Sequence, residues 1–199
     1  LDPLTMNLSF GSVTSTNSGG NGVFIDGGNA TAAGNNALTV TTLSVTGSTS
    51  AGLRITNSTG TFNFGATTVN NAGSAGGGVD LDLGTGDTAT VNFTGALDID
   101  TNAATGFDAN GTGGTLLTVN VASAGTQAIN SATGGLISFN QVAVGASGIS
   151  FDNLGSSGKI SGNAVTMTSV GGSGTFSGGN MNIAGASGNG IDIASSSGA

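Results

Sequence analysis

The residues of this chain that could do chemistry are its aspartates. All ten acidic residues among its 199 residues are Asp, and six of them fall between Asp80 and Asp108. Asp80 and Asp82 alternate with apolar residues, so they would point outward from one strand, and Asp108 holds the place of Asp80 in the next copy of the same motif. Neighbouring carboxylates repel one another, and Ca²⁺ prefers oxygen ligands. Asp80, Asp82 and Asp108 are therefore the candidate metal site, with Ca²⁺ as the ion.

A second interpretation of these aspartates needs no metal. Asp is common at strand ends and corners, where its carboxylate is solvated and hydrogen-bonds its own backbone. Arg54 would also fall next to Asp80 in the outward column. The β-roll calcium motif Gly-Gly-x-Gly-x-Asp is approached at 75–80 and at 187–192, but each copy lacks its first Gly and the two are far more than nine residues apart. A calcium mechanism that runs through every repeat is therefore excluded.

The composition argues against an enzyme. Paired carboxylates can hydrolyse glycosides, but the chain has no Glu, His, Cys, Tyr or Trp, and its only cations are Arg54 and Lys159. A developing anion would have few groups to stabilise it. We therefore expect no catalytic residues and no cofactor beyond the candidate Ca²⁺. The net charge of −8 also excludes nucleic acid as a partner, because phosphate binding needs clustered Lys and Arg.

The elements that would position the aspartates are short strands arranged in a repeat. A motif of Gly, apolar, any residue, apolar begins at residues 22, 52, 78, 106, 148 and 190, with a degenerate copy at 128. Two further runs of alternating apolar and polar residues lie between most successive copies, as at 62–64 and 97–99. Alternation with period two indicates strands with one buried face, and recurrence every 20 to 30 residues indicates a solenoid.

Three strands per repeat predict an all-β fold, a single right-handed parallel β-helix of about eight coils. It would span residues 1–199 as one domain without a C-terminal cap. Equivalent strands of successive coils would lie ~4.8 Å apart, so that like residues stack inside. One predicted internal ladder consists of Val23, Leu53, Val79, Phe107, Ile129, Ile149 and Ile191, and another contains Phe64, Phe93 and Phe139. An antiparallel β-sandwich also has short strands at this density, but it gives no reason for one motif to recur.

The segment from 93 to 101 that runs into 105–107, together with 188–193, resembles the right-handed β-helix repeats of very large bacterial surface proteins, including adhesins and autotransporter-type passengers. The resemblance covers nearly the whole chain. It implies a cell-surface stalk, adhesin or matrix fibre, and it brings no catalytic residue with it.

These observations favour a structural, non-catalytic β-solenoid of an extracellular fibre or adhesin stalk at the bacterial cell surface. No apolar run of the chain approaches ~18 residues, the length that could span a membrane. We expect no leader peptide in this sequence, and we expect it to be a mature product or a piece of a longer protein. An open β-helix exposes unpaired backbone at its ends. The expected partners are copies stacked end to end or the flanking β-helix of the parent protein, with a surface glycan as a candidate ligand.

The alternative function is a carbohydrate-binding or ice-surface-binding solenoid. Ice binding needs regular Thr-x-Thr ranks on a flat face. Thr39 with Thr41, and Thr88 with Thr90, fit that pattern locally, but the pattern does not recur in every coil.

Overall fold

The computed structural model describes residues 7–27, 37–112, 116–122 and 124–195, and in these residues the chain is an all-β parallel solenoid without helices. The described residues form 19 strands in two sheets, of 12 and seven strands, and every strand pair with a defined register is parallel. The larger sheet contains β1 (Leu8–Thr16), β3 (Ala37–Thr46), β5 (Gly60–Asn71), β7 (Thr88–Phe93), β8 (Leu97–Thr101), β10 (Leu116–Val121), β11 (Gln127–Ser131), β13 (Val142–Ser150), β14 (Asn153–Ser156), β16 (Gly171–Gly172), β17 (Phe176–Ser177) and β18 (Asn180–Asn182). The smaller sheet contains β2 (Val23–Asp26), β4 (Leu53–Thr56), β6 (Val79–Leu83), β9 (Phe107–Gly111), β12 (Ile137–Asn140), β15 (Val165–Thr168) and β19 (Ile191–Ala194).

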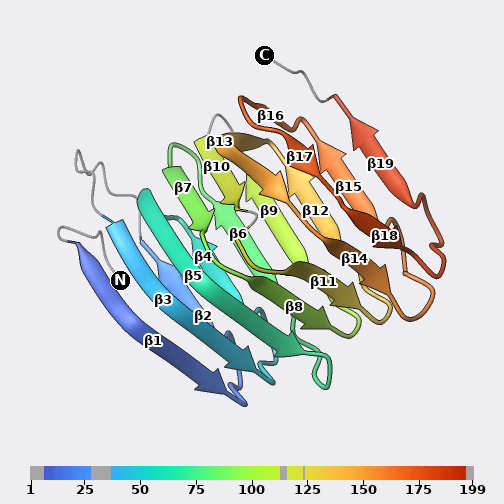
Figure 1. Ribbon diagram of the computed structural model, residues 1–199, viewed down its shortest axis with the longest axis horizontal. Helices are drawn as coiled ribbons and strands as arrows, with labels where there is room; N and C mark the ends of the chain where they lie inside the picture. Colours follow the sequence, from blue (N-terminus) through green and yellow to red (C-terminus); the bar gives the residue numbers. More distant parts are fainter. Residues whose placement is uncertain (1–6, 28–36, 113–115, 123, 196–199) are drawn as a thin grey trace.

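Each turn of the chain contributes three strand segments. Two consecutive segments belong to the larger sheet, either as one long strand such as β5 or as a pair such as β7 and β8, and the third belongs to the smaller sheet. In Figure 1 the larger sheet lies in front with its strands running down, the smaller sheet runs up behind it, and successive coils follow from left to right. This winding is right-handed, the usual hand for parallel strands joined by a crossover.

The solenoid has about six turns, fewer than the eight coils that the sequence predicts. The seven strands of the smaller sheet begin at residues 23, 53, 79, 107, 137, 165 and 191, so the repeat is 26 to 30 residues throughout. Six strand spacings of ~4.8 Å give a stack about 29 Å long. Residues 196–199, where the sequence predicts no cap, lie outside the described residues.

The first predicted ladder is correct for Val23, Leu53, Val79, Phe107 and Ile191, and it is wrong for Ile129 and Ile149. Phe107 stacks on Ile137, which stacks on Val165 and then Ile191. Ile129 and Ile149 belong to the larger sheet instead, where Ile129 pairs with Ile99 and Ile149 with Val121. The second ladder holds for Phe64 and Phe93, but Phe139 stacks on Ala109 in the smaller sheet.

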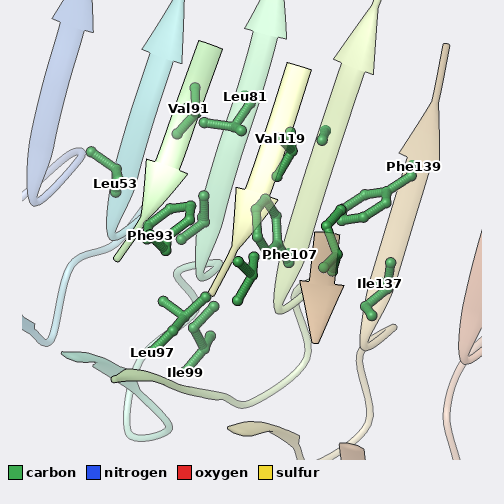
Figure 2. Close-up of a cluster of buried hydrophobic side chains, with 14 of the residues drawn as sticks. Leu53, Leu81, Val91, Phe93, Leu97, Ile99, Phe107, Val119, Ile137 and Phe139 are labelled. Atoms are coloured by element: carbon green, nitrogen blue, oxygen red, sulfur yellow. The ribbon is translucent and has the colours of Figure 1, made fainter. Parts of the chain in front are cut away.

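The interior is a narrow apolar core that both sheets fill. Figure 2 shows Phe93, Phe107 and Phe139 pointing toward one another from different strands. The Phe107 ring lies edge-on to both, with centroids 5.7 Å from Phe93 and 5.1 Å from Phe139. Edge-to-face pairs of this kind add about 0.5–1.5 kcal/mol beyond burial. Phe therefore supplies the bulk that the absent Trp and Tyr would otherwise give.

The corners between segments are built from small and polar residues. In β5 the inward residue Phe64 is followed by Gly65 and Ala66, which both face away from the core, and the chain bends before Thr67 turns inward again. A Cβ at Gly65 would meet the carbonyl of Thr41 in the preceding coil, so glycine permits this close approach.

A buried amide closes another corner. The fully buried Asn71 donates hydrogen bonds to Ser48 Oγ at 2.6 Å and to the Gly77 carbonyl at 2.7 Å, and it accepts one from the Ser48 backbone N–H at 2.9 Å. Its polar groups are thus satisfied, as burial requires.

Candidate functional site

The outward face of the smaller sheet carries the predicted aspartates in the predicted register. Arg54 of β4 pairs with Asp80 of β6, and Asp80 pairs with Asp108 of β9. Asp82 lies two residues further along β6, beside Thr56 and Asn110. The structure therefore brings Asp80, Asp82 and Asp108 onto two neighbouring strands, as the alternation of the sequence indicates.

Arg54 is the counter-ion of this group. Its Nε lies 3.3 Å from Asp80 Oδ2 and its Nη2 lies 3.7 Å from Asp82 Oδ2. The Nε is buried but its orientation makes no hydrogen bond, so the contact is an ion pair only. The side chains of Arg54, Asp80 and Asp82 are 37%, 29% and 44% exposed, so these ion pairs contribute little to stability.

Burial dominates the protonation of the two stacked carboxylates. It raises the pKa of Asp80 above its usual value. Arg54 opposes that rise, while Asp108 and Asp82 add to it. Burial likewise raises the pKa of Asp108, against a hydrogen bond from Ser138 that lowers it. The net direction of the pKa is upward for both. Desolvation and neighbouring carboxylates outweigh Arg54 at Asp80, and they outweigh the hydrogen bonds from Ser138 and Ala109 at Asp108.

The described residues contain no group of three or more acidic, His or Cys side chains arranged to hold a metal ion. The positive charge next to Asp80 and Asp82 comes from Arg54. Calcium binding by Asp80, Asp82 and Asp108 stays a prediction, which a titration can test.

Two outward ladders of side-chain amides are the most regular polar feature. In the larger sheet, Asn120 Nδ2 donates to Asn92 Oδ1 and Asn92 Nδ2 donates to Asn63 Oδ1, both at 2.8 Å. In the smaller sheet, Asn140 donates to Asn110 at 2.8 Å, and Asn110 donates to Asp82 at 3.3 Å. Each amide joins two coils, because the strand spacing brings equivalent side chains within hydrogen-bond reach.

Sequence reasoning missed these ladders, although a signal was present. Asn63, Asn92 and Asn120 each stand between two apolar residues and recur at intervals of 29 and 28 residues. The same coils place Thr61, Thr90 and Thr118 in one adjacent column. In these coils the outward face of the larger sheet therefore carries rows of the form Thr-x-Asn. Thr39 of the preceding coil stacks on Asn63, so it belongs to the Asn column. Ice binding expects Thr-x-Thr ranks.

Comparisons of the chain with protein-family models, with curated proteins and with solved structures each return no match. The class of the protein, a parallel β-solenoid of stacked coils, therefore rests on the structure itself. Among the described residues there is no helix long and apolar enough to cross a membrane.

Proposed function

We propose that this chain is a structural, non-catalytic segment of an extracellular bacterial fibre or adhesin stalk. In this role the solenoid is a rod, and a further coil continues its winding at the ends. That coil would come from the flanking β-helix of a longer parent protein or from another copy of the chain.

Apolar ladders that are buried inside the solenoid continue in the same register to its ends, where their last residues are exposed. This is the main support for the proposal. Ile191 and Ile193 of β19 continue two buried ladders of the smaller sheet, yet they are 52% and 59% exposed. At the other end Phe10 of β1 stacks on the buried Val40 and is 45% exposed. A further coil at either end would bury these side chains and remove the cost of their exposure.

The backbone supports the same interpretation. In the described part of the chain β2 and β19 are the outermost strands of the smaller sheet, and each pairs on one side only. An unpaired parallel edge presents N–H and C=O groups that another strand can pair with. A further stacked coil would therefore extend both the apolar ladders of the core and the backbone hydrogen bonds of the sheets.

The exterior and the charge support an extracellular location. Only 6% of the residues are charged, and hydroxyl and amide groups supply most of the polar surface. Amide ladders that bridge successive coils would stiffen such a rod along its axis. Stiffness without a catalytic centre is what a stalk requires.

Light scattering after size exclusion tests the proposal over a range of protein concentrations. We expect the mass to rise with concentration in the wild type. Ile193→Asp should abolish that rise, because it places a charge on the exposed end of a ladder. Asn153→Asp, which adds the same charge at an exposed position of β14, a strand that is paired on both sides, should leave the rise unchanged. A wild type that stays monomeric at every concentration would refute stacking of copies.

A further inference from the structure

A hollow on the outer surface of the larger sheet has no role in the rod. Its volume is about 440 Å³, within the range of small-molecule sites. It lies over the second segments of the later coils, β8, β11, β14 and β18, which Figure 1 shows side by side. Asp100, Asn130, Ser156, Ser157 and Asn182 are among its lining residues, so polar side chains surround it.

The hollow exists because one side chain is missing from an outward column. Equivalent positions of six successive coils carry Thr46, Asn70, Asp100, Asn130, Gly155 and Asn182. Five of these six residues have polar side chains, and Gly155 has none. The backbone does not demand glycine there, because Gly155 has no positive φ. A Cβ built on it would have Asn130 Oδ1 as its nearest neighbour, at 3.3 Å.

Because Gly155 has no side chain, the side chains of Asn130 and Asn182 on either side of it are not connected by hydrogen bonds. Asn130 Nδ2 donates to Asp100 Oδ1 at 3.0 Å, which orients the amide and turns its Oδ1 toward Gly155. In the complete ladders the next amide donates to that oxygen at 2.8 Å. Across the gap, the side chain of Asn182 makes no hydrogen bond within the described residues and offers both a donor and an acceptor.

Serine hydroxyls extend this polar lining. Ser156 Oγ accepts a hydrogen bond from the Ala184 backbone N–H at 2.9 Å, so its own proton remains available to donate. Ser157 is exposed beside it. Asn130 and Asn182 are two strand spacings apart, about 9.6 Å, so one layer of a ligand fits between them.

We propose that this hollow binds a neutral saccharide, whose hydroxyl groups complete the interrupted ladder. Hydroxyls both donate and accept, as the facing Asn130 oxygen, Asn182 amide and serine hydroxyls require. The carboxylate of Asp100 and the net charge of −8 disfavour an anionic ligand. An added peptide strand would need a free sheet edge, but β11 and β14 are paired on both sides. This proposal does not depend on the proposed stalk function, because the chain could form a stalk whether or not the hollow binds a saccharide.

Saturation-transfer NMR with maltotriose, cellotriose and triacetylchitotriose as probes tests the proposal. We expect transfer to at least one of these sugars with a Kd in the millimolar range, because the site is open and offers only a few hydrogen bonds. Gly155→Asn should weaken this binding at least tenfold, because the new side chain fills the gap and completes the ladder. Its melting temperature should be unchanged or raised, which separates loss of the site from loss of the fold.

Ala128→Asn is the matched control. It adds the same side chain to the outward face of β11, next to Asp98, but Ala128 does not line the hollow. We expect this variant to bind the sugars as the wild type does. The proposal is overturned if none of the three sugars shows transfer to the wild type at tens of millimolar, or if Gly155→Asn binds them as well as the wild type.

Discussion

The same substitution in the middle and at the end of one internal ladder should have very different costs. Ile55 of β4 is fully buried, and Ile193 of β19, five strands further along the same ladder, is 59% exposed. Replacing Ile by Ala removes three carbon atoms, or about 2.4 kcal/mol at ~0.8 kcal/mol per buried carbon group. A cavity in the core raises the cost of Ile55→Ala to about 2–5 kcal/mol. With less than half of Ile193 covered, Ile193→Ala should cost about 1 kcal/mol or less.

Urea denaturation followed by far-UV circular dichroism measures both costs, since the chain has no Trp or Tyr for fluorescence. The protein should be dilute enough to be monomeric, because a stacked coil would bury Ile193. Free energy in a solenoid adds up from neighbouring coils, so backbone hydrogen exchange in β4 should report the loss in Ile55→Ala locally. Equal destabilisation by the two variants in the monomer would refute the assignment of Ile193 to an open end.

Three further predictions concern the polar exterior. Asn92→Ala removes two ladder hydrogen bonds of about 0.5–1.5 kcal/mol each and should lower the free energy of unfolding by about 1–3 kcal/mol, whereas the exposed Asn153→Ala should change it by less than about 0.5 kcal/mol. Because burial raises the pKa of Asp80 and Asp108 in the folded state above the usual value of 3.8, their contribution to stability is full below that pH and is lost as the pH rises through the folded-state pKa values. In urea titrations, Asp108→Asn should reduce this fall of the free energy of unfolding with pH. At pH 7 it should stabilise the protein by about 0.2–1 kcal/mol, because it removes the like-charge pair with Asp80. A less stable Asp108→Asn at pH 7 would contradict this prediction. If Asp80, Asp82 and Asp108 bind Ca²⁺, we expect a higher melting temperature in CaCl₂ than in EDTA, and Asp108→Asn should abolish the difference. Equal melting temperatures would remove the cation site and leave Arg54 as the counter-ion of the cluster.

The fold could be predicted from the sequence because alternation and recurrence are both visible in it. The Gly-led motif marks β2, β4, β6 and β9 correctly, and this was enough to place Arg54, Asp80 and Asp108 in one column. Glycine marks the start of these strands because a Cβ there would collide with a β-branched core side chain, which is Val45 at Gly22, Val69 at Gly52 and Ile129 at Gly106. A Cβ at Gly78 would meet the carbonyl of Gly106.

The repeat was misassigned where the structure no longer uses glycine. Leu136 and Ala164 are buried at the positions equivalent to Gly106, so β12 and β15 lack the expected signal. Gly148 lies within β13, in the stretch between Val144 and Ile149 where the register against β10 shifts. The residues that follow it belong to the larger sheet, so this glycine does not mark a strand of the smaller sheet. Alternation identifies a strand, but it does not identify which of the three segments of a coil that strand supplies.

The amide ladders and the hollow depend on register across coils, so this misassignment concealed the hollow. Asn130, Gly155 and Asn182 become neighbours only when β11, β14 and β18 are aligned. No local motif distinguishes Gly155 from the chain's other glycines. Its significance lies in the column that it interrupts.

Negative-stain electron microscopy over a range of concentrations can show whether the coils form a rod whose open ends accept another coil. We expect rods of one constant width, with lengths that increase in steps of one solenoid as the protein is concentrated, and Ile193→Asp should reduce them to single units. Compact particles of unchanging length at every concentration, identical in the wild type and in Ile193→Asp, would contradict it.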